Sequence, residues 1–564
     1  MGIPRFFQFI RQTFPSCVDY KTIHENLDFD IDNFYIDANG IIHNSVRQIL
    51  FSKPKQEKRL ARIQNRSYLT LKEKHQKIFE HITDTIYKIT QFANPKQLLF
   101  IAIDGSAPMA KQSQQRQRRF RSAMEINKNE FKEFDKNSIT PGTYFMQQLS
   151  FYIEYYIRRK MQDDEYWRSL DIVFSNSNEP GEGEHKIINY IRGLPNKKDI
   201  SHCMYGLDAD LFMLSLSTHC EKFWLMREDV FSNDMLLHFH IGNIGKLRYL
   251  MNELWNSKNK KQVDRLINDF IFLCFLIGND FLHHTPMCHD LCWSIRTLMD
   301  CRQELFEETN EYITTTNGKS YHISKLKKYL FVLKKYEPYA IADLRHNNTF
   351  EYPAVNTSLI ENNNKVDLDK FRELYYKKAN IKDKEKYLKD YLEGLEWVNY
   401  YYHSEPNNWK WVFPYLYTPL ITDLALFLES KPKLNRLSKK HTDKIEPYEQ
   451  LLCVLPLKSK YNIPKGLHEI IFDDTIKQYY PEEFAIDIEG KAKEWQGVAL
   501  LPFLDYSILH TKYLDDKYTD IRNQKRNQFN TKKLYKFNQD IKYNYKSSYG
   551  YISPCNIKTI EIQN

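Results

Sequence analysis

Seven acidic residues stand where apolar segments of the chain give way to polar ones. Five are aspartates that end or follow an apolar segment, and two are glutamates that flank a glycine: Asp37, Asp104, Asp208, Asp210, Asp280, Glu182 and Glu184. Carboxylates that crowd together cannot all ionise unless cations compensate them. Oxygen ligands without paired Cys or His favour Mg²⁺, with Mn²⁺ as a substitute, and this number of carboxylates indicates two ions. Two divalent ions close together stabilise the attacking hydroxide and the leaving oxygen of phosphodiester hydrolysis.

Each of these acids also has an ordinary structural interpretation. A single aspartate at the end of a strand is more often a helix cap or a turn former. Glu182 and Glu184 precede or open a predicted helix, where the helix dipole favours carboxylates without any metal. The recurrence of acids at equivalent strand ends favours the metal site over these alternatives.

A cationic segment, DGSAPMAKQSQQRQRRFR, follows the strand that ends at Asp104. No Gly or Pro occurs between Pro108 and Pro141, so one long helix is predicted from Lys111 onward. Three cations and an amide have the spacing i, i+4, i+7, i+8, which places them on one helix face suited to a phosphate: Lys111, Gln115, Arg118 and Arg119. The same spacing directs Arg116 and Arg121 elsewhere. A solvated basic face is the alternative, but residues 111–124 contain no Asp or Glu, which favours an anionic ligand.

Apolar runs alternate with helical patterns through the first 300 residues. Strands are expected before Asp37, at 97–104, at 171–177, before Asp208 and at 223–228. This alternation predicts an α/β fold with a doubly wound, mostly parallel sheet. Ligands of such sheets bind at the carboxyl ends of the strands, where the predicted acids lie.

The pattern changes along the chain and divides it into four regions. Residues 1–300 form the predicted catalytic region, 301–368 a solvated linker, 369–510 a second apolar and aromatic region, and 511–564 a basic, Tyr-rich tail.

Composition excludes some classes of protein. Hydrophobic residues make up 42% of the 564 residues, which is typical of a globular protein with a sizeable core. The net charge of +9 fits a polyanionic partner without requiring one. The longest apolar run, 270–277, is too short to span a bilayer, and the N-terminus lacks a signal-peptide pattern. Nine scattered cysteines, an odd number, indicate a reduced, intracellular protein.

Segments along most of residues 1–510 resemble the two conserved regions of the 5′-to-3′ exoribonucleases, the XRN family. MGIPRFF, DANGIIHN, DGSAPMAKQSQQRQRRFR, FDKNSITPGTYFM, PGEGEHKI, HCMYGLDADLFML and IGNDFL resemble the first region. EGLEWVNYYY, NWKWVFPYLYTP, PYEQLLCVLPLKSK and YYPEEFAIDIEGKAKEWQGVALLPFLD resemble the second. NSITPGT and HCMYGLDAD look more like the cytoplasmic branch than the nuclear one. After IGNDFL, His283 stands where the family has proline.

The resemblance implies a role for each candidate residue. The seven acids would hold two Mg²⁺ ions, and Lys111, Gln115, Arg118 and Arg119 would bind the 5′-phosphate, with Lys111 also close to the scissile phosphate. His43 would stack on the 5′-terminal base together with Trp409 or Trp411, for which core packing is the alternative. The fold implied is a nuclease core like that of PIN and flap nucleases, with a protruding long helix. An α-rich second region would wrap around this core and complete the active-site pocket.

The function implied is that of a compact, processive, Mg²⁺-dependent 5′-to-3′ exoribonuclease without the family's long C-terminal extension. It would act as a monomer on single-stranded RNA with a 5′-monophosphate end, in mRNA decay. The location implied is the cytoplasm, with the nucleus as the alternative and the host cytoplasm if the source is viral. Two other functions stay open: a flap-type 5′ DNA nuclease, and a catalytically silent scaffold that binds 5′-monophosphate RNA.

Overall fold

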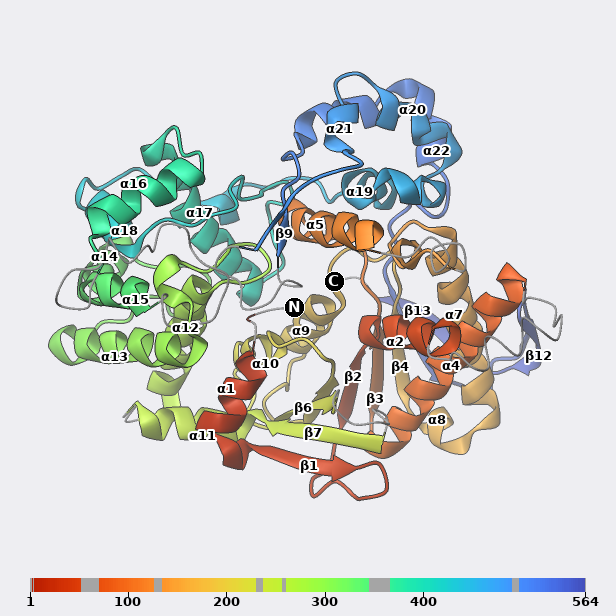
Figure 1. Ribbon diagram of the computed structural model, residues 1–564. Helices are drawn as coiled ribbons and strands as arrows, with labels where there is room; N and C mark the ends of the chain where they lie inside the picture. Colours follow the sequence, from red (N-terminus) through yellow and green to blue (C-terminus); the bar gives the residue numbers. More distant parts are fainter. Residues whose placement is uncertain are drawn as a thin grey trace, which may run out of the picture.

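A nine-stranded sheet forms the centre of the chain (Figure 1). The computed structural model describes residues 3, 5–51, 70–125, 134–229, 237–255, 260–343, 366–488 and 497–562. The strands lie in the order β1-β7-β6-β5-β2-β3-β4-β10-β13. They are β1 (Val18–Thr22), β2 (Asn33–Asp37), β3 (Leu98–Ala102), β4 (Asp171–Ser175), β5 (His202–Tyr205), β6 (Phe223–Glu228), β7 (His238–Asn243), β10 (Lys532–Phe537) and β13 (Ile557–Ile562).

The five central strands, β6-β5-β2-β3-β4, are parallel to one another, and the pairs at both edges are antiparallel. Every residue of β2, β3 and β5 is buried. Strands that are covered on both faces have apolar side chains in both directions, which explains the continuous apolar runs in the sequence. The predicted α/β fold with a mostly parallel sheet is confirmed.

Different helices cover the two faces of this sheet (Figure 1). Alternate strand residues face opposite ways, so Tyr35 and Phe100 pack into one hydrophobic cluster and Phe34 and Ile101 into the other. The first face is covered by α1 (Phe6–Thr13), α9 (Gly183–Gly193), α10 (Leu211–Leu216), α11 (Ile244–Leu254) and α12 (Lys260–Cys274). The second is covered by α2 (Asn39–Leu50), α4 (Leu71–Ala93), α7 (Tyr144–Asp163) and α8 (Glu165–Ser169).

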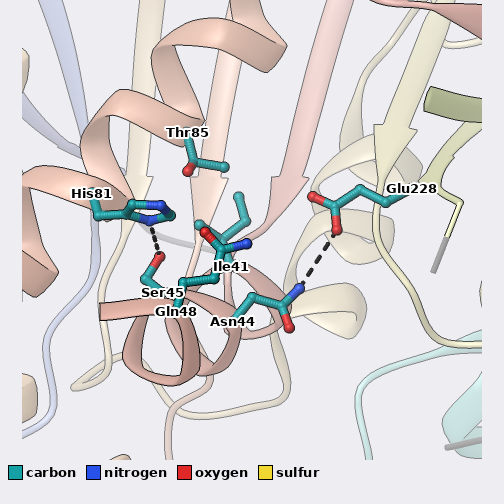
Figure 2. A pocket seen from close by; sticks show the side chains of 7 residues that line it. All are labelled: Ile41, Asn44, Ser45, Gln48, His81, Thr85 and Glu228. Atoms are coloured by element: carbon teal, nitrogen blue, oxygen red, sulfur yellow. Dashed lines mark hydrogen bonds between the residues drawn. The ribbon is translucent and has the colours of Figure 1, made fainter. Parts of the chain in front are cut away.

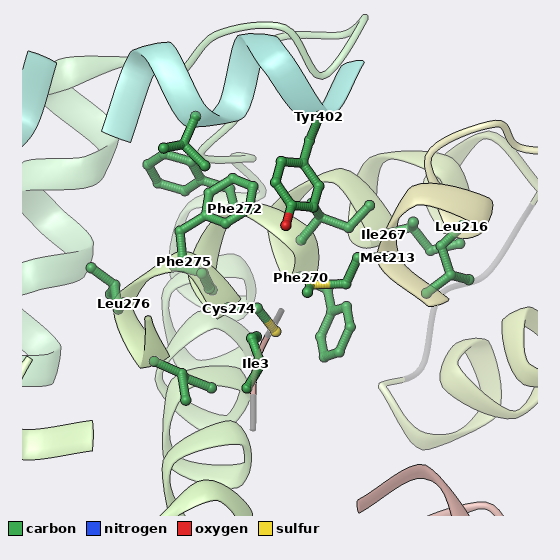
Figure 3. Close-up of a cluster of buried hydrophobic side chains, with 14 of the residues drawn as sticks. Ile3, Met213, Leu216, Ile267, Phe270, Phe272, Cys274, Phe275, Leu276 and Tyr402 are labelled. Atoms are coloured by element: carbon green, nitrogen blue, oxygen red, sulfur yellow. The ribbon is translucent and has the colours of Figure 1, made fainter. Parts of the chain in front are cut away.

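The apolar helix α12 joins the sheet layer to the later helices. Phe270 and Phe272 lie in one buried cluster with Met213 of α10 and Tyr402 of α17 (Lys384–His403) (Figure 3). Full burial of such side chains stabilises the fold by about 1.5–3 kcal/mol each. Within the ranges listed above, none of the helices combines the length and the apolar character that a bilayer crossing requires.

The second half of the chain is mostly helical and lies on one side of the sheet and above it (Figure 1). One group shares the buried cluster of α12 or forms a smaller cluster next to it: α13 (Leu291–Thr309), α14 (Ile323–Leu333), α15 (Glu337–Asp343), α16 (Leu368–Lys378), α17 (Lys384–His403) and α18 (Ile421–Glu429). Another forms a cluster with α5 (Met109–Glu125): α19 (Pro447–Val454), α20 (His468–Phe472), α21 (Tyr506–Tyr513) and α22 (Thr519–Arg522). The predicted long helix thus begins at Met109, and residues 126–133 lie outside the described residues.

Part of the predicted linker 301–368 is instead folded. It contains the end of α13 together with α14 and α15, and residues 344–365 lie outside the described residues. Leu326, Tyr329, Leu330 and Leu333 have the spacing i, i+3, i+4, i+7 and form the buried face of α14. Charged residues between them obscured this apolar stripe.

The basic tail extends the main sheet. Strand β10 pairs with β4, and β13 pairs with β10. Two further strands, β11 (Tyr543–Ser547) and β12 (Gly550–Cys555), form a separate hairpin. Residues 532–562 are therefore part of the folded structure next to β4.

Candidate active site

Three of the predicted acids meet at the carboxyl end of the parallel strands. Asp37 is the last residue of β2, Asp104 follows β3 by two residues, and Glu184 lies in the first turn of α9. One carboxylate oxygen from each lies within 4.8 Å of the other two. Glu182, Glu184 and His185 form a second group with ligand atoms within the same distance. The sheet edge therefore gathers four of the seven predicted acids in two overlapping groups.

Gly183 allows α9 to approach this edge. A Cβ atom here would lie 2.8 Å from Asp37 Oδ1 and 3.3 Å from Asp104 Oδ1, and the closer contact is shorter than van der Waals packing permits. The Gly183 N–H donates to Asp104 Oδ1 at 2.7 Å, which satisfies one of the N–H groups that a helix start leaves unpaired. The absence of a side chain between the two glutamates thus permits the three elements to converge.

Lys111 connects the acids to α5. Its Nζ donates to Asp280 Oδ2 at 2.6 Å and pairs with Glu182. Burial alone would lower the pKa of Lys111, but Asp280 and Glu182 outweigh burial and raise that pKa well above its usual value.

Asp280 follows Gly278, whose φ of +98° favours glycine. A Cβ at Gly278 would lie 2.7 Å from the backbone nitrogen of His284.

Asp208 and Asp210 lie in the turn between β5 and α10. Asp210 is 5% exposed, and its Oδ2 accepts a hydrogen bond from the Tyr402 hydroxyl at 3.3 Å. Its Oδ1 is buried and has no hydrogen-bond partner among the described residues. A buried carboxylate oxygen without a partner is costly, and a cation would satisfy it.

Burial and mutual repulsion raise the pKa values of most of these acids. Burial is the largest cause of the raised pKa of Asp37 and Glu184, and neighbouring carboxylates, including Asp208 beside Asp37, raise it further. Burial also raises the pKa of Glu182 to about 7, although Lys111 opposes the shift. At Asp280, Lys111 and other positive charges outweigh burial and lower the pKa. Buried carboxylates of this kind hold protons unless a cation replaces them, so this oxygen-rich set fits divalent metal ions.

We expect Mg²⁺ to stabilise the protein less at pH 6 than at pH 8. Glu182 must lose its proton to bind a cation, and a carboxyl with a pKa of about 7 is roughly 90% protonated at pH 6 and about 10% at pH 8. In the metal-free protein, the raised pKa of Glu182 stabilises the folded state at pH values below the pKa that this residue has in the unfolded chain. This stabilisation is lost as the pH rises through about 7. The measurement is the rise in Tm when Mg²⁺ is added to EDTA-treated protein, and equal rises at both pH values would contradict the prediction.

Two tyrosines of α17 support the acids from the second region. The Tyr401 hydroxyl donates to Glu182 Oε1 at 2.9 Å, and Tyr402 contacts Asp210. The His185 ring stacks on Tyr401 with centroids 3.8 Å apart and planes 4° apart. Sequence reasoning gave none of these three residues a role. The available signals were the adjacent tyrosines in EGLEWVNYYY and the histidine directly after Glu184.

The four predicted phosphate ligands differ in their surroundings. Lys111 contacts the acids, and Arg118 is exposed. Arg119 is buried and donates to Asn137 Oδ1 at 3.4 Å and to the Ile139 carbonyl at 3.3 Å, and burial lowers its pKa to about 9. Gln115 is also buried. The cationic face thus runs from the acid cluster toward solvent.

Arg116 and Arg121 leave this face, as the helical spacing predicted. Arg116 donates to the Cys453 carbonyl at 3.0 Å and lies over the rings of Phe120 and Tyr480. Arg121 donates to the Gly497 carbonyl at 2.8 Å. Both arginines therefore fasten α5 to the second region.

The three predicted stacking residues lie in different surroundings. Desolvation, and then the positive charges of Arg118 and Arg119, lower the pKa of His43 to about 3, although His43 is one of the exposed residues. Trp409 is 2% exposed, and its carbonyl accepts from Met109 N–H at 2.7 Å. Trp411 packs on Trp397 with centroids 4.8 Å apart. Among the described residues, neither tryptophan has a ring contact with His43. Which tryptophan stacks on the base together with His43 stays a prediction.

Comparisons with known proteins agree with this architecture. A family model described as "XRN 5′-3′ exonuclease N-terminus" matches residues 1–229, and one described as "Xrn1 helical domain" matches residues 260–370 and 362–561. The catalytic core of Rad2 in complex with a DNA substrate aligns with a TM-score of 0.29 and 12% identity, over 67% of this chain and 96% of that chain. This likeness is too weak to support an argument.

Three curated relatives carry the name 5′-3′ exoribonuclease 1. The protein from Saccharomyces cerevisiae is 28% identical over 98% of this chain and 45% of its own length. That from Schizosaccharomyces pombe is 29% identical over 98% and 51%, and that from Homo sapiens 29% over 90% and 33%. This chain spans about a third to a half of the length of these relatives. With both family models matched over most of its residues, the chain belongs to the XRN 5′-3′ exonuclease family.

Proposed function

We propose that this chain is a processive 5′-to-3′ exoribonuclease that hydrolyses single-stranded RNA with a 5′-monophosphate end to nucleoside 5′-monophosphates. It acts as a monomer, requires two Mg²⁺ ions, for which Mn²⁺ substitutes, and serves mRNA decay in the cytoplasm. Family membership supports this proposal. The observation that carries it is Lys111, which joins a cluster of buried carboxylates to a helix face of cations.

The acids would hold the metal ions at the edge of the sheet. The ligand set proposed is Asp37, Asp104, Glu182, Glu184, Asp208, Asp210 and Asp280. The bound ions would supply the positive charge that stabilises the attacking and leaving oxygens. Lys111 keeps an ammonium group at the point where α5 meets the acids, so its proposed partner in the substrate is the scissile phosphate. Tyr401 and Tyr402 orient Glu182 and Asp210 through their hydroxyl groups.

The 5′-phosphate would bind the face of α5 formed by Lys111, Gln115, Arg118 and Arg119. Lys111 and Arg118 are about 10 Å apart along the helix axis, which suits cleavage close to the anchored end. Hydrolysis there leaves a new 5′-phosphate on the shortened strand, and the same face binds it again. The reaction regenerates the group that the helix recognises, which accounts for processivity and disfavours a bulkier triphosphate or cap.

His43 would stack on the 5′-terminal base, with Trp409 or Trp411 as its partner. Every base has an aromatic face, so stacking of this kind accepts any sequence. The lowered pKa of His43 keeps its ring neutral at physiological pH. Degradation is therefore expected to be independent of base sequence.

A degradation assay tests the proposal. End-labelled single-stranded RNA carries a 5′-monophosphate, a 5′-triphosphate or a 5′-hydroxyl, and each is incubated with Mg²⁺ or with EDTA. We expect mononucleotide release from the 5′-monophosphate RNA and none with EDTA. Tight binding without release would favour the silent scaffold, and preferential cleavage of flap DNA would favour the 5′ DNA nuclease.

Arg118→Met and Arg116→Met should affect different properties, the first RNA binding and the second the stability of the fold. Arg118 is exposed on the phosphate-binding face, so its loss should lower kcat/KM for 5′-monophosphate RNA about 10- to 100-fold, mainly through KM, with little change in Tm. Arg116 binds the Cys453 carbonyl inside the protein, so its loss should cost about 1–3 kcal/mol of stability and leave the preference for a 5′-phosphate in place. Steady-state kinetics and thermal denaturation of the two variants measure both effects. Loss of the 5′-phosphate preference in Arg116→Met alone would contradict this assignment.

A further inference from the structure

The Gln450 side chain crosses from the second region to α5. Gln450 lies on α19 and is 0% exposed. Its Oε1 accepts a hydrogen bond from the Ala107 N–H at 2.8 Å, and its Nε2 donates to Gln115 Oε1 at 3.4 Å. Gln115 belongs to the face of α5 that carries Lys111 and Arg118, so this buried amide reaches the proposed phosphate site without lying in it.

The backbone sets the direction of this hydrogen-bond chain. The Ala107 N–H can only donate, so Gln450 must turn its oxygen toward it. The NH₂ group of Gln450 then faces Gln115, whose side-chain oxygen must accept the hydrogen bond. Within the described part of the chain, the Gln115 side chain makes no other hydrogen bond. Its Nε2, with two N–H donors, is the end that remains for a ligand.

The polarity of the Gln115 amide decides whether it attracts a phosphate. An N–H donor binds a phosphate oxygen, whereas an amide oxygen in the same place repels it. A free glutamine can rotate and present either end, and fixing the better end before binding lowers the ordering cost. The peptide group that carries the Ala107 N–H is itself held, because its carbonyl, that of Ser106, accepts a hydrogen bond from the Gly181 N–H at 2.7 Å. The chain from Ala107 through Gln450 to Gln115 is therefore anchored at its start.

We propose that Gln450 is a positioning residue that turns the Gln115 amide so that its N–H donors face the 5′-phosphate. Gln450 thereby contributes to the preference for 5′-phosphorylated over 5′-hydroxyl RNA ends without touching the RNA. This inference rests on the proposed function, since it places the phosphate at this face of α5. It assigns to the second region a part in end recognition.

The first test reverses the polarity. In Gln450→Glu one carboxylate oxygen still accepts from Ala107, and the other offers Gln115 an acceptor, which turns the Gln115 amide around. The selectivity ratio, kcat/KM for 5′-monophosphate RNA divided by that for 5′-hydroxyl RNA, should fall about tenfold, through KM rather than kcat. Gln450→Met removes the constraint without reversing it and should lower the ratio about threefold. If the buried carboxylate prevents folding of Gln450→Glu, Gln450→Met carries the test.

A double-mutant cycle separates this role from a merely structural one. Gln115→Met removes the donor, so adding either Gln450 substitution to it should lower the selectivity ratio no further. An unchanged ratio in the Gln450 single variants, or an equal fall in the Gln115→Met background, would overturn the inference while leaving the proposed function intact. A wild-type protein without any preference for 5′-monophosphate ends would overturn the proposed function itself, and the inference with it.

Discussion

Glu184→Gln is expected to abolish RNA degradation, with a fall in kcat of at least about 10³-fold. Glu184 belongs to both groups of converging ligand atoms, one with Asp37 and Asp104 and the other with Glu182 and His185. Glutamine keeps the shape of the side chain but replaces a charged oxygen with an amide, which is a poor ligand for a divalent ion. The loss should therefore concern metal binding rather than folding.

The stability of the same variant gives a second, independent result. Burial, and then the charges of Glu182 and Asp37, raise the pKa of Glu184 well above its usual value, so the metal-free carboxyl keeps its proton to a higher pH than a solvated glutamate does. Glutamine mimics this protonated form, and above the folded pKa it also removes repulsion. In EDTA the Tm should equal or exceed that of the wild type, whereas Mg²⁺ should raise the Tm of the variant less than that of the wild type.

Glu228→Gln is the matched control. Glu228 ends the parallel strand β6 and is 4% exposed. It accepts hydrogen bonds from Tyr205 and Asn44 and lines a small cavity with Ser45 and His81 (Figure 2), and none of the seven predicted acids is among the residues that line this cavity. We expect this variant to degrade RNA. Equal loss of activity in both variants would mean that disturbance of the sheet, rather than loss of a ligand, explains the effect.

The central strands could be predicted from the sequence because parallel strands are buried on both faces. Their apolar runs are continuous, so the predicted interval 223–228 coincides with β6, and the predicted 171–177 contains β4. The acids were located through the same logic, since Asp37 and Asp104 follow apolar runs that lie side by side. A local pattern sufficed here because strand ends in a parallel sheet meet at one edge.

The contacts of the second region could not be predicted in this way. Tyr401 reaches Glu182 across 219 positions of sequence, and Gln450 reaches Gln115 across 335. No local periodicity reports such a contact, because it depends on how α17 and α19 pack against the sheet and α5. The same limit applies to Trp409 and Trp411, whose spacing fits both core packing and base stacking.

The strands of the basic tail could not be predicted from the sequence for a different reason. In β10 only Lys532 and Tyr535 are buried, and the other residues of KKLYKF are partly exposed. A strand near the edge of a sheet with one lysine among its buried residues does not show the regular alternation that identifies a strand from sequence. Its position depends on pairing with β4, more than 350 residues earlier.

Lys532→Met is expected to destabilise the protein by about 3–5 kcal/mol, because it removes the ion-pair partner of a buried carboxylate. Lys532 Nζ lies 3.1 Å from Glu179 Oε1, and the two side chains are 5% and 4% exposed. Glu179 Oε2 accepts a hydrogen bond from Ser175 Oγ at 2.5 Å, so both carboxylate oxygens have their partners inside the protein. Thermal denaturation should show a clearly lowered Tm.

Lys536→Met provides the control on the same strand. Lys536 pairs with Asp171 at 2.6 Å, but these side chains are 43% and 41% exposed. Solvent screens such a pair, so its loss should cost at most about 1 kcal/mol. The double variant Lys532→Met with Glu179→Gln removes both buried charges and should recover most of the stability lost in Lys532→Met alone.

Lys532→Met should also affect catalysis, because its partner Glu179 lies three residues before Glu182 in the loop that leads into α9. Asn178, next to it, donates to the Gln528 carbonyl of the tail at 2.8 Å, so the tail holds this loop at two adjacent positions. Loosening one of them should lower kcat, since ligand groups displaced even slightly lose much of their effect. Lys532→Met should therefore reduce degradation of 5′-monophosphate RNA about tenfold at a temperature where it remains folded, and Lys536→Met should not. Full activity in folded Lys532→Met would show that the tail stabilises the sheet without positioning the acids.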